Sequence, residues 1–377
     1  MLTVLLWISV GLWTLFFIQM VVNWVLVRDL RKLNAPSPEK WPFVSIVVPA
    51  RDEERSVHRA VSSFCRQDYE GFEVIVVDDQ STDRTPQILH GLQSRYPNLT
   101  VITGTGPPDG WHGKPNALET GRRAAKGDWL LFVDADVVYA PGLLRRAIAY
   151  ALEQDVGMLV LMPRFATGQV LETVMMSTLY LVVFACFPLF LVARSRNKWF
   201  AVGNGVFNLV RRDALQACGA FESLKGAVLD DVGLGYKVRQ AGHGIAVGLA
   251  GPLVYIRMYH GTRELVRGFT KNAFPMSRNR PWLVAVPFLL GTILSLLPYI
   301  GLIAGMTHGF ISIPAMIALI LMHLVTVGLA IRFHQPWYVT FLNPLREVCW
   351  WGVLLRSFIA YHRHGIVWRG RRYHDKA

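Results

Sequence analysis

Two aspartates one residue apart follow an apolar run in the first half of the chain. The run 129–133 has the length and composition of a buried strand, and it leads into Asp134 and Asp136. Such carboxylates suit Mg²⁺ or Mn²⁺, which bind one or two of them together with the phosphates of a substrate. The pattern predicts a cation site for a nucleotide or pyrophosphate. A strand followed by a helix cap gives the same spacing, because aspartate is a common cap residue.

Other predicted strands also end in polar turns. The apolar runs 44–49 and 72–77 alternate with helical stretches, which is typical of an α/β fold. The second run leads into Asp78 and Asp79, and two adjacent acids repel each other unless a ligand or a cap uses them. Because ligands of open α/β sheets bind outside the carboxyl ends of the strands, these turns are candidate parts of the same site.

The composition indicates a membrane protein. Of the 377 residues, 52% are hydrophobic, and the mean hydropathy of +0.32 exceeds that of an ordinary soluble domain. Residues 1–27 carry no charge, and about 20 apolar residues suffice to cross a bilayer. Without a basic start or a small-residue cleavage site, this segment is interpreted as a retained anchor. The basic residues that follow, Arg28, Arg31 and Lys32, favour a cytoplasmic location for the next domain.

The rest of the chain divides by composition. Residues 42–275 are expected to form the cytoplasmic α/β domain, and 281–331 a transmembrane helical hairpin. Residues 337–377 contain an apolar stretch and a basic tail. Charge bias favours an interfacial helix there, with a further crossing as the alternative. The apolar block 170–193 lies inside the α/β domain and is expected to be interfacial or re-entrant, because a single crossing would separate its two flanks.

Charge and cysteine content exclude several other classes of protein. The net charge is +13, from 39 basic and 26 acidic residues, but many charges flank apolar segments and no nucleic-acid motif accompanies them. This distribution suits an anionic membrane surface and a phosphorylated substrate. The four cysteines show no paired spacing, so neither a zinc site nor a disulfide framework is expected, in agreement with a reducing cytosolic face.

Five motifs occur in a fixed order along the chain. They are Val47–Glu54, Val76–Thr85, Gly113–Ala117, Asp134–Asp136 and Leu229–Asp231. Together they resemble family 2 glycosyltransferases with the GT-A fold, and more narrowly the membrane-bound bacterial enzymes associated with carotenoid and hopanoid pathways. The resemblance implies a Rossmann-like mixed sheet, a nucleotide-sugar donor and inversion at the anomeric carbon.

The resemblance also implies roles for individual residues on the donor side. Those assigned to the nucleotide and sugar donor are Ala50, Glu53, Asp78, Asp79, Lys114, Asn116 and Asp134. Lys114 would place a cation near the pyrophosphate. Asp136 is assigned as the direct ligand of Mn²⁺ or Mg²⁺, which would stabilise the departing diphosphate.

An alcohol acceptor needs a base, and the last motif supplies one. Asp230 and Asp231 open a predicted helix, 232–241. The family usually has Glu-Asp here, with the second residue as base, so Asp231 is the predicted base and Asp230 an accessory group. The alternative is that both aspartates only cap the helix and interact with its dipole.

Two further groups are candidates for contact with the acceptor or the diphosphate. Gly203, Asn204 and Gly205 resemble a strand beside the acceptor, although a tight turn explains the glycines equally well. Arg263 and Arg267 lie where processive members carry Gln-x-x-Arg-Trp, and surface or lipid-facing charge is their alternative role. Because that motif is absent from the sequence, a processive polymer synthase is not expected.

These observations predict a non-processive, metal-dependent, inverting hexosyltransferase of the inner membrane. It would move a sugar, with glucose as the first choice, from a UDP-sugar to a membrane lipid such as a carotenoid, hopanoid or glycerolipid. An interfacial block in the catalytic domain suits a lipid acceptor better than a soluble one. A polyprenyl-phosphate glycosyltransferase and a non-catalytic membrane scaffold are the alternatives.

Overall fold

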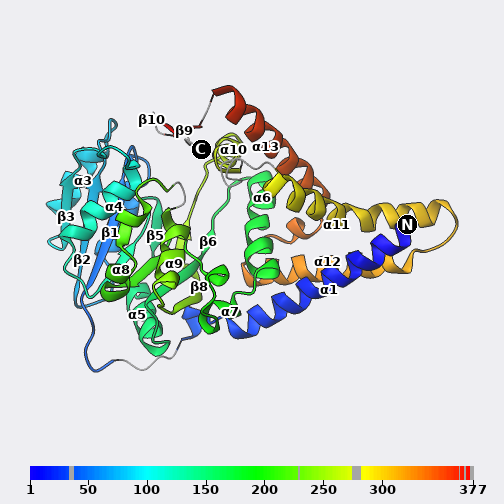
Figure 1. Cartoon of the computed structure of the whole chain (residues 1–377), viewed down its shortest axis with the longest axis horizontal. Helices are drawn as coiled ribbons and strands as arrows, with labels where there is room; N and C mark the ends of the chain where they lie inside the picture. Colours follow the sequence, from blue (N-terminus) through cyan, green and yellow to red (C-terminus); the bar gives the residue numbers. More distant parts are fainter. Residues whose placement is uncertain (34–37, 228–229, 274–281, 365, 369–370, 374–377) are drawn as a thin grey trace. The chain divides into compact units, whose positions relative to one another are not determined.

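The computed structural model describes the chain except residues 34–37, 228–229, 274–281, 365, 369–370 and 374–377 (Figure 1). The expected domain limits at 275 and 281 and Leu229 of the fifth motif therefore lie outside the described residues. The chain forms two compact units. The α/β unit comprises Val25–Ala166 and Leu189–Arg257, and the helical unit comprises Met1–Trp24, Thr167–Pro188 and Met258–Ala377.

An eight-stranded mixed sheet is the centre of the α/β unit, as far as the structure describes it. Its order is β3-β2-β1-β4-β7-β6-β8-β5. Strands β3, β2, β1 and β4 are parallel, whereas β7 is antiparallel to both β4 and β6. The strands are β1 (Val44–Ala50), β2 (Phe72–Asp78), β3 (Leu99–Thr103), β4 (Trp129–Phe132), β5 (Val137–Tyr139), β6 (Met158–Phe165), β7 (Asn208–Arg211) and β8 (Ile245–Ile256). The predicted α/β class and mixed sheet are confirmed.

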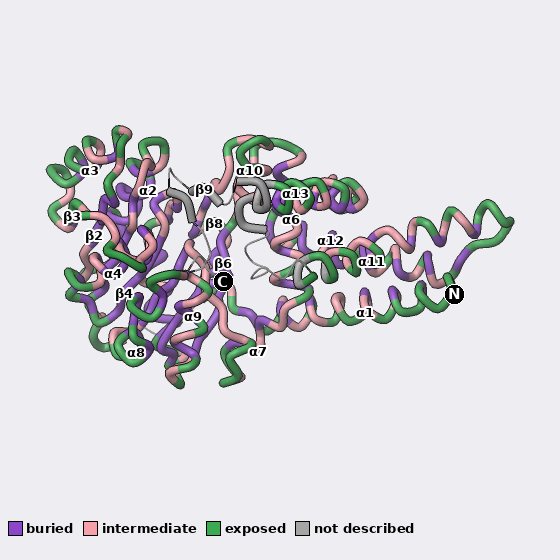
Figure 2. The backbone as a smooth tube through the Cα atoms, turned by 45° about the horizontal axis from the view of Figure 1, so that its top comes forward, coloured by how far each residue is buried: buried purple, intermediate pink, exposed green. Residues whose placement is uncertain are grey.

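Helices cover the sheet, so its central strands are apolar on both faces. Apart from the partly buried Pro49, every residue of β1 is buried, as expected for a parallel strand between two helical layers (Figure 2). The helices of this unit are α2 (Val57–Cys65), α3 (Thr85–Gln93), α4 (Gly113–Ala124), α5 (Leu143–Glu153), α7 (Phe190–Arg194), α8 (Arg212–Ala217) and α9 (Asp230–Gln240). Three single turns complete it: η1 (Leu30–Lys32), η3 (Lys198–Phe200) and η4 (Ala220–Leu224).

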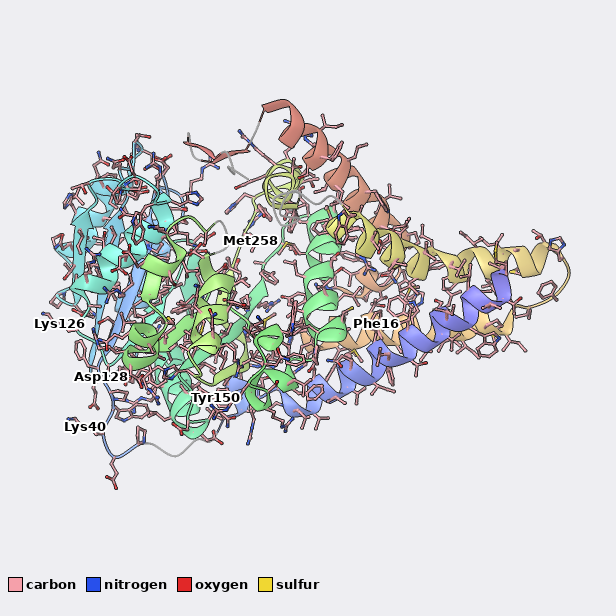
Figure 3. The ribbon with its side chains drawn as sticks, in the orientation of Figure 1. Phe16, Lys40, Lys126, Asp128, Tyr150 and Met258 are labelled. Carbon is pink, nitrogen blue, oxygen red and sulfur yellow. The ribbon has the colours of Figure 1, made fainter. Side chains whose placement is uncertain are left out.

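Polar side chains fasten the edges of this core to neighbouring backbone. The Asp128 carboxylate accepts a hydrogen bond of 3.1 Å from the Phe43 amide just before β1, and the Tyr150 hydroxyl donates one of 3.4 Å to the Val247 carbonyl in β8 (Figure 3). Both bonds join segments distant in sequence. They fix where β1 begins and how α5 lies against β8, and thereby help to align the strand ends that carry the motifs.

The helical unit contains three helices that are long and apolar enough to cross a membrane. These are Leu2–Leu26, Phe288–Thr307 and Ile313–Arg332, judged by length and composition among the described residues. The elements are α1 (Leu2–Leu26), α6 (Val170–Tyr180), the π-helical turn η2 (Leu181–Cys186), α10 (Thr262–Ala273), α11 (Trp282–Thr307), α12 (Ile313–Arg332), η6 (Trp337–Thr340) and α13 (Asn343–His364), followed by the short strands β9 (Ile366–Trp368) and β10 (Arg371–Tyr373).

Within the helical unit, side chains satisfy backbone groups that regular helices leave open. The buried Asn23 amide of α1 donates to the carbonyls of Phe184 and Phe187, at 2.7 and 2.9 Å, where η2 ends. The Tyr180 and Phe333 rings stack with centroids 4.0 Å apart. The apolar block 170–193 is divided at Pro188: α6 and η2 belong to the helical unit, and α7 belongs to the α/β unit.

Candidate active site

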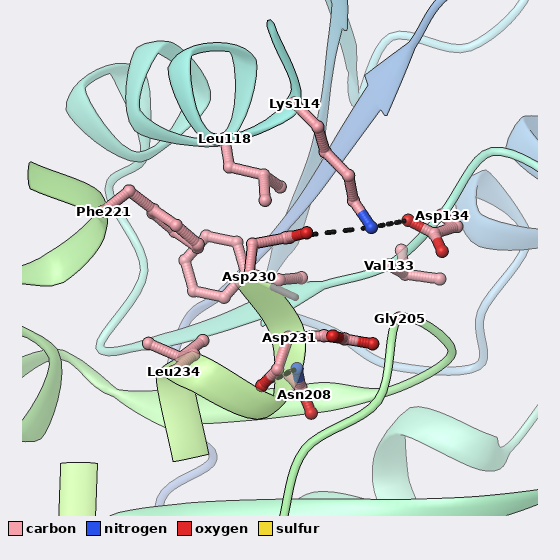
Figure 4. Close-up of a pocket in the computed structure, with 11 residues that line it drawn as sticks. Lys114, Leu118, Val133, Asp134, Gly205, Asn208, Phe221, Asp230, Asp231 and Leu234 are labelled. Carbon is pink, nitrogen blue, oxygen red and sulfur yellow. Dashed lines mark hydrogen bonds and ion pairs between the residues drawn. The ribbon is translucent and has the colours of Figure 1, made fainter. Parts of the chain in front are cut away.

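A small pocket lies in the α/β unit beyond the end of β4 (Figure 4). One part of its wall is apolar and the other is charged. The apolar side chains come from Leu118, Phe132, Val133, Phe221 and Leu234, and the charged ones from Lys114, Asp134, Asp230 and Asp231. The structure therefore brings residues of three separate sequence motifs together, as expected when strand ends meet at one edge of a sheet.

Lys114 joins two of these motifs. Its ammonium lies 2.7 Å from the Asp134 carboxylate and 3.6 Å from that of Asp230. Burial disfavours its charge, yet Asp134, Asp230 and Asp231 hold the pKa of Lys114 well above its ordinary value. One cation thus faces three acids, so the pocket has an excess of negative charge when all of them are ionised.

The two aspartates that open α9 differ in their surroundings. Asp230 is buried, and desolvation raises its pKa to about 7 against the opposing charge of Lys114. Desolvation also raises the pKa of Asp231, whose Oδ1 accepts a 2.8 Å hydrogen bond from the Val232 amide. Asp231 therefore both bonds to the first turn of α9 and lines the pocket. A carboxylate with a raised pKa is a better proton acceptor, which is what a general base requires.

Asp136 is the best candidate for holding a divalent cation. Its Oδ1 is buried, and it has no hydrogen-bond partner among the described residues. Burial, together with the charges of Asp134 and Glu53, raises the pKa of Asp136 to about 7. A bound cation would compensate the buried charge of Asp136 and give its Oδ1 a partner, so the residues present fit Mn²⁺ or Mg²⁺. The described residues include no group of three or more metal-ligating side chains, and oxygens of a phosphorylated donor would have to complete the coordination.

The predicted nucleotide-binding residues lie in turns that are already hydrogen-bonded to one another. The Ala50 carbonyl accepts a 2.8 Å bond from the Asp79 amide, which aligns the ends of β1 and β2. The Arg51 guanidinium donates to the Asp79 carbonyl at 2.7 Å and lies 3.6 Å from its carboxylate. The Asp78 Oδ1 accepts a 3.2 Å bond from the Ser81 amide. Both aspartates are buried, and part of their role is to shape the turns.

Further hydrogen bonds connect the two turns side by side. Asp52 Oδ1 accepts from the Thr82 amide at 2.7 Å, and Thr85 Oγ1 accepts from the Glu53 amide at 2.7 Å. The Asp83 carboxylate accepts from the amides of Glu54 and Thr85, at 3.0 and 2.9 Å. We refer to the segments 50–56 and 78–85 as the turn network. Its acids receive several hydrogen bonds from backbone amides, whereas the acids of the pocket mainly face the one ammonium of Lys114.

Asn116 is directed to the protein rather than to the pocket. It lies on α4, two residues after Lys114, and its amide nitrogen donates to the Gly106 carbonyl at 3.2 Å. Adjacent positions of a helix point in different directions, so Lys114 reaches the pocket wall while Asn116 does not line it.

The glycines of the segment 203–205 allow close approach of backbone to the pocket acids. A Cβ on Gly203 would collide with the Asp231 carbonyl, and one on Gly205 would collide with the Asp134 carboxylate. The Asp134 amide also donates to the Gly205 carbonyl at 2.8 Å. The sequence suggested that this segment lies beside the acceptor, and in the structure the groups that closely approach its glycines belong to the protein itself.

Asn204 stabilises this loop through both the oxygen and the nitrogen of its side-chain amide. Its Oδ1 accepts from the amides of Val206 and Phe207, at 3.0 and 2.9 Å, and its Nδ2 donates to the Leu161 carbonyl at 3.0 Å. These bonds hold the loop beside Asp134 and Asp231. Asn204 is therefore a positioning residue in this structure.

Several residues that sequence reasoning missed support the pocket. The buried Tyr139 hydroxyl donates to the Val206 carbonyl at 2.7 Å, and Asn208 donates to the Asp231 carbonyl at 3.4 Å. Phe221 packs edge-on against Phe132 with ring centroids 4.8 Å apart. Of these residues, only Asn208 could have been found from the sequence, because a polar amide inside the apolar run 206–210 needs a hydrogen-bond partner. Tyr139 and Phe221 carried no signal beyond ordinary apolar positions.

Arg263 and Arg267 belong to the helical unit. Both lie on α10 with exposed side chains, and neither is among the residues that line the pocket of the α/β unit. Their predicted contact with the diphosphate stays a prediction.

The mixed sheet, the acidic turns at its strand ends and the charged pocket define a glycosyltransferase of the GT-A type. In agreement, the family model described as glycosyl transferase family 21 matches residues 10–376, so the chain belongs to this family. The resemblance inferred from the five motifs is confirmed at the level of the GT-A glycosyltransferases.

Individual relatives and a solved structure agree with this assignment. The chain is 27% identical over 346 residues to 4,4'-diaponeurosporenoate glycosyltransferase of Staphylococcus aureus strain USA300, with 88% of each chain covered. The enzyme of the same name from strain MRSA252 is 26% identical over 343 residues, again with 88% of each chain covered. Among solved structures, a mannosyltransferase from Pyrobaculum calidifontis in complex with GDP-mannose and Mn²⁺ is similar, with a TM-score of 0.53 at 18% identity, covering 96% of this chain and 99% of the other. This likeness supports the fold.

Proposed function

We propose that this protein is a membrane-bound, non-processive, inverting glycosyltransferase that moves a sugar from a UDP-sugar to a membrane lipid. Glucose is the first sugar to test. The observation that carries the proposal is the grouping of Lys114, Asp134, Asp230 and Asp231 around one pocket at the strand ends. An acidic pocket with one lysine suits a donor diphosphate that arrives with a divalent cation.

On the donor side, the turn network would receive the nucleotide through Asp78 and Asp79. Lys114 would then stand near the pyrophosphate and offset its charge. Asp136, together with Asp134, would hold Mn²⁺ or Mg²⁺, which when bound spreads the negative charge of the leaving diphosphate.

On the acceptor side, Asp231 would act as the base. As the acceptor hydroxyl oxygen forms its bond to the anomeric carbon, Asp231 takes the hydroxyl proton. The bond from that carbon to the diphosphate oxygen breaks with its electron pair on the diphosphate. Attack from the opposite face inverts the configuration. The buried Asp230 would keep Lys114 in place.

The acceptor is proposed to be a lipid. Two observations support this: the three helices able to span a membrane, and the similarity to diaponeurosporenoate glycosyltransferases. The name of those relatives denotes a carboxylate acceptor. An ionised carboxylate is already a nucleophile at neutral pH, whereas a hydroxyl needs a base. The chemical class of the acceptor therefore decides how strongly the reaction depends on Asp231.

We propose a multi-pass protein of the inner membrane with the α/β unit in the cytoplasm. Crossings at 1–27 and within 281–331 would leave 170–193 and 337–377 at the interface. Arg28 and Lys32 favour this orientation by the positive-inside tendency.

Transfer of labelled glucose from UDP-glucose into the organic-extractable lipid of membranes that contain the protein tests the function. We expect labelling that requires Mn²⁺ or Mg²⁺ and disappears in Asp231→Asn when the acceptor is a hydroxyl. Labelling only after addition of polyprenyl phosphate would show the alternative acceptor. If no nucleotide sugar gave labelling and UDP with Mn²⁺ produced no thermal shift of the purified protein, the scaffold interpretation would replace the proposal.

A further inference from the structure

Two long segments of the α/β unit contain basic residues and no acidic ones. Segments 189–212 and 232–257 contain no aspartate or glutamate. Their lysines and arginines are Arg194, Arg196, Lys198, Arg211, Arg212, Lys237, Arg239 and Arg257. The first segment includes α7 and η3, and the second includes the C-terminal part of α9. Helix α9 contacts η3, and Arg239 of α9 bonds to the Val192 carbonyl of α7. Five of these basic residues, Arg194, Arg196, Lys198, Lys237 and Arg239, lie on or between α7, η3 and α9, whereas Arg211 pairs with Asp155 and Asp213 elsewhere.

Arg239 is the unusual member of this group because it is buried. Only 4% of the residue is exposed, and one guanidinium nitrogen donates to the Val192 carbonyl at 2.5 Å. Its Nε is buried and has no hydrogen-bond partner among the described residues. Burial and the like charge of Arg196 lower its pKa, although a guanidinium remains protonated.

A buried cation of this kind is costly unless an anion compensates it. No ion pair between Arg239 and an acid occurs in the described part of the chain, and the charge that acts on its pKa is that of another cation, Arg196. The chain itself therefore provides a second cation and no anion. This points to an anionic ligand from outside the protein.

The surface beside Arg239 has the composition of a membrane interface. The exposed Arg196 is oriented by a 3.1 Å bond from its guanidinium to the Gly242 carbonyl. Trp199 is 77% exposed, and its turn is capped by Asn197 through a 3.0 Å bond. The Lys198 ammonium lies 6.0 Å from the centre of the Tyr236 ring. Exposed tryptophan and tyrosine beside lysine and arginine are typical of the headgroup layer.

We propose that this surface, formed by Leu189–Phe200 and the C-terminal half of α9, binds the phosphate of an anionic phospholipid. Arg239 and Arg196 would be the phosphate-binding cations, and Trp199 would lie in the headgroup layer. Chain continuity supports a lipid over a soluble anion. Leu189 directly follows Pro188, where a segment of the helical unit ends, and that unit contains the helices able to span a membrane. Such a site would attach the α/β unit to the leaflet independently of any acceptor.

Lipid retention by the full-length protein tests this proposal. The protein in detergent is incubated with equal amounts of phosphatidylglycerol and phosphatidylcholine, and bound lipid is counted by native mass spectrometry. We expect preferential retention of phosphatidylglycerol, reduced roughly tenfold in the double variant Arg196→Gln, Lys198→Gln, whose two side chains are exposed. Lys126→Gln is the matched control, because Lys126 is an exposed lysine of the same unit outside this surface.

Several results of the lipid-retention experiment would overturn the proposal. They are equal retention of the two lipids by the wild type, unchanged retention in the double variant, and an equal loss in Lys126→Gln. Displacement of the lipid by inorganic phosphate at the same concentration would also overturn it, because the site would then prefer a free anion.

Arg239 is tested separately by thermal unfolding, with and without phosphatidylglycerol. The lipid should raise the melting temperature of the wild type and of Arg239→Lys, which keeps the charge, but not that of Arg239→Gln. A full lipid-induced shift in Arg239→Gln would exclude Arg239 from the site.

Discussion

Acidic side chains gather in two parts of the α/β unit, and their surroundings differ. In the turn network, Asp52, Asp78 and Asp83 accept hydrogen bonds from backbone amides, and Asp79 is paired with Arg51. In the pocket, three carboxylates share the single ammonium of Lys114, and the nearby Asp136 has a buried oxygen without a partner in the described residues. The protein supplies hydrogen-bond donors to both groups, but in the pocket one ammonium faces three carboxylates, so negative charge there is not fully compensated.

The two groups also differ in how they are held. Side-chain hydrogen bonds connect the turn network, whereas backbone contacts at glycines bring the pocket walls together: Gly203 lies against the Asp231 carbonyl, and Gly235 of α9 lies against the Val202 carbonyl. Perturbed pKa values without a compensating partner cluster at functional sites. The comparison therefore shows that the turn network is held in shape by its own hydrogen bonds, whereas the pocket keeps an excess of negative charge that a cation would compensate.

The largest effect is expected at Asp231, and it depends on the acceptor. Asp231→Asn keeps the shape of the side chain but removes the base, so turnover with a hydroxyl acceptor should fall about 10²- to 10⁴-fold. With an ionised carboxylate acceptor the loss should stay below about tenfold, because no proton has to be removed. Initial rates with the two acceptor types, together with the dissociation constant of UDP, measure the difference. Equal losses with both acceptors would mean that Asp231 positions groups rather than accepting a proton.

Substitution of Gly235 should have the next largest effect, which is on the free energy of unfolding. A Cβ there would meet the Val202 carbonyl, which cannot move without displacing the loop at 203–205, so Gly235→Ala should lower the free energy of unfolding by about 2–3 kcal/mol. Gly91→Ala is the control, since Gly91 lies in α3 with nothing within 4 Å of an added Cβ. Alanine favours helix there and should be neutral or stabilise by up to about 1 kcal/mol. Equal melting temperatures of the two variants would contradict the close contact.

The turn network should respond to loss of a hydrogen-bond acceptor. Burial opposes its charge, but hydrogen bonds from Thr85 and Glu54 keep the pKa of Asp83 below its ordinary value. Asp83→Asn should cost about 1 kcal/mol of stability at neutral pH and leave turnover within a few-fold of wild type. A depressed pKa stabilises the fold above the unfolded-state pKa, and this contribution disappears as pH falls through the folded-state pKa. The difference between the two proteins in urea unfolding should therefore shrink below about pH 4.

The smallest effect on stability is expected at Asp136, and its sign should be opposite. Asp136→Asn removes a buried, unpartnered carboxylate, so the ligand-free variant should be as stable as wild type or more stable by up to about 1 kcal/mol. The same change should abolish the additional thermal stabilisation by UDP that Mn²⁺ provides. Thermal scans with UDP, with and without Mn²⁺, measure both effects. Clear destabilisation of the ligand-free variant would place Asp136 with the turn network.

Much of the fold and the grouping of the pocket residues could be predicted from sequence. Apolar runs followed by acids locate the ends of β1, β2 and β4, and parallel strands bring such ends to one edge of a sheet. The candidate span Leu2–Leu26 was visible in the same way, because an uncharged segment of that length is rare outside membranes. Periodicity and composition are local properties, so sequence alone determined which segments are strands, helices and candidate spans.

The tertiary structure decided which side chains of each motif face the pocket. Lys114 lies 3.6 Å from Asp230, although more than a hundred residues separate them, while its near neighbour Asn116 bonds to Gly106 instead. The segment around Arg239 looks like an ordinary helix end in sequence, and only packing shows that its guanidinium is buried beside Arg196. Partners of this kind depend on how distant elements pack, and no local pattern in the chain contains that information.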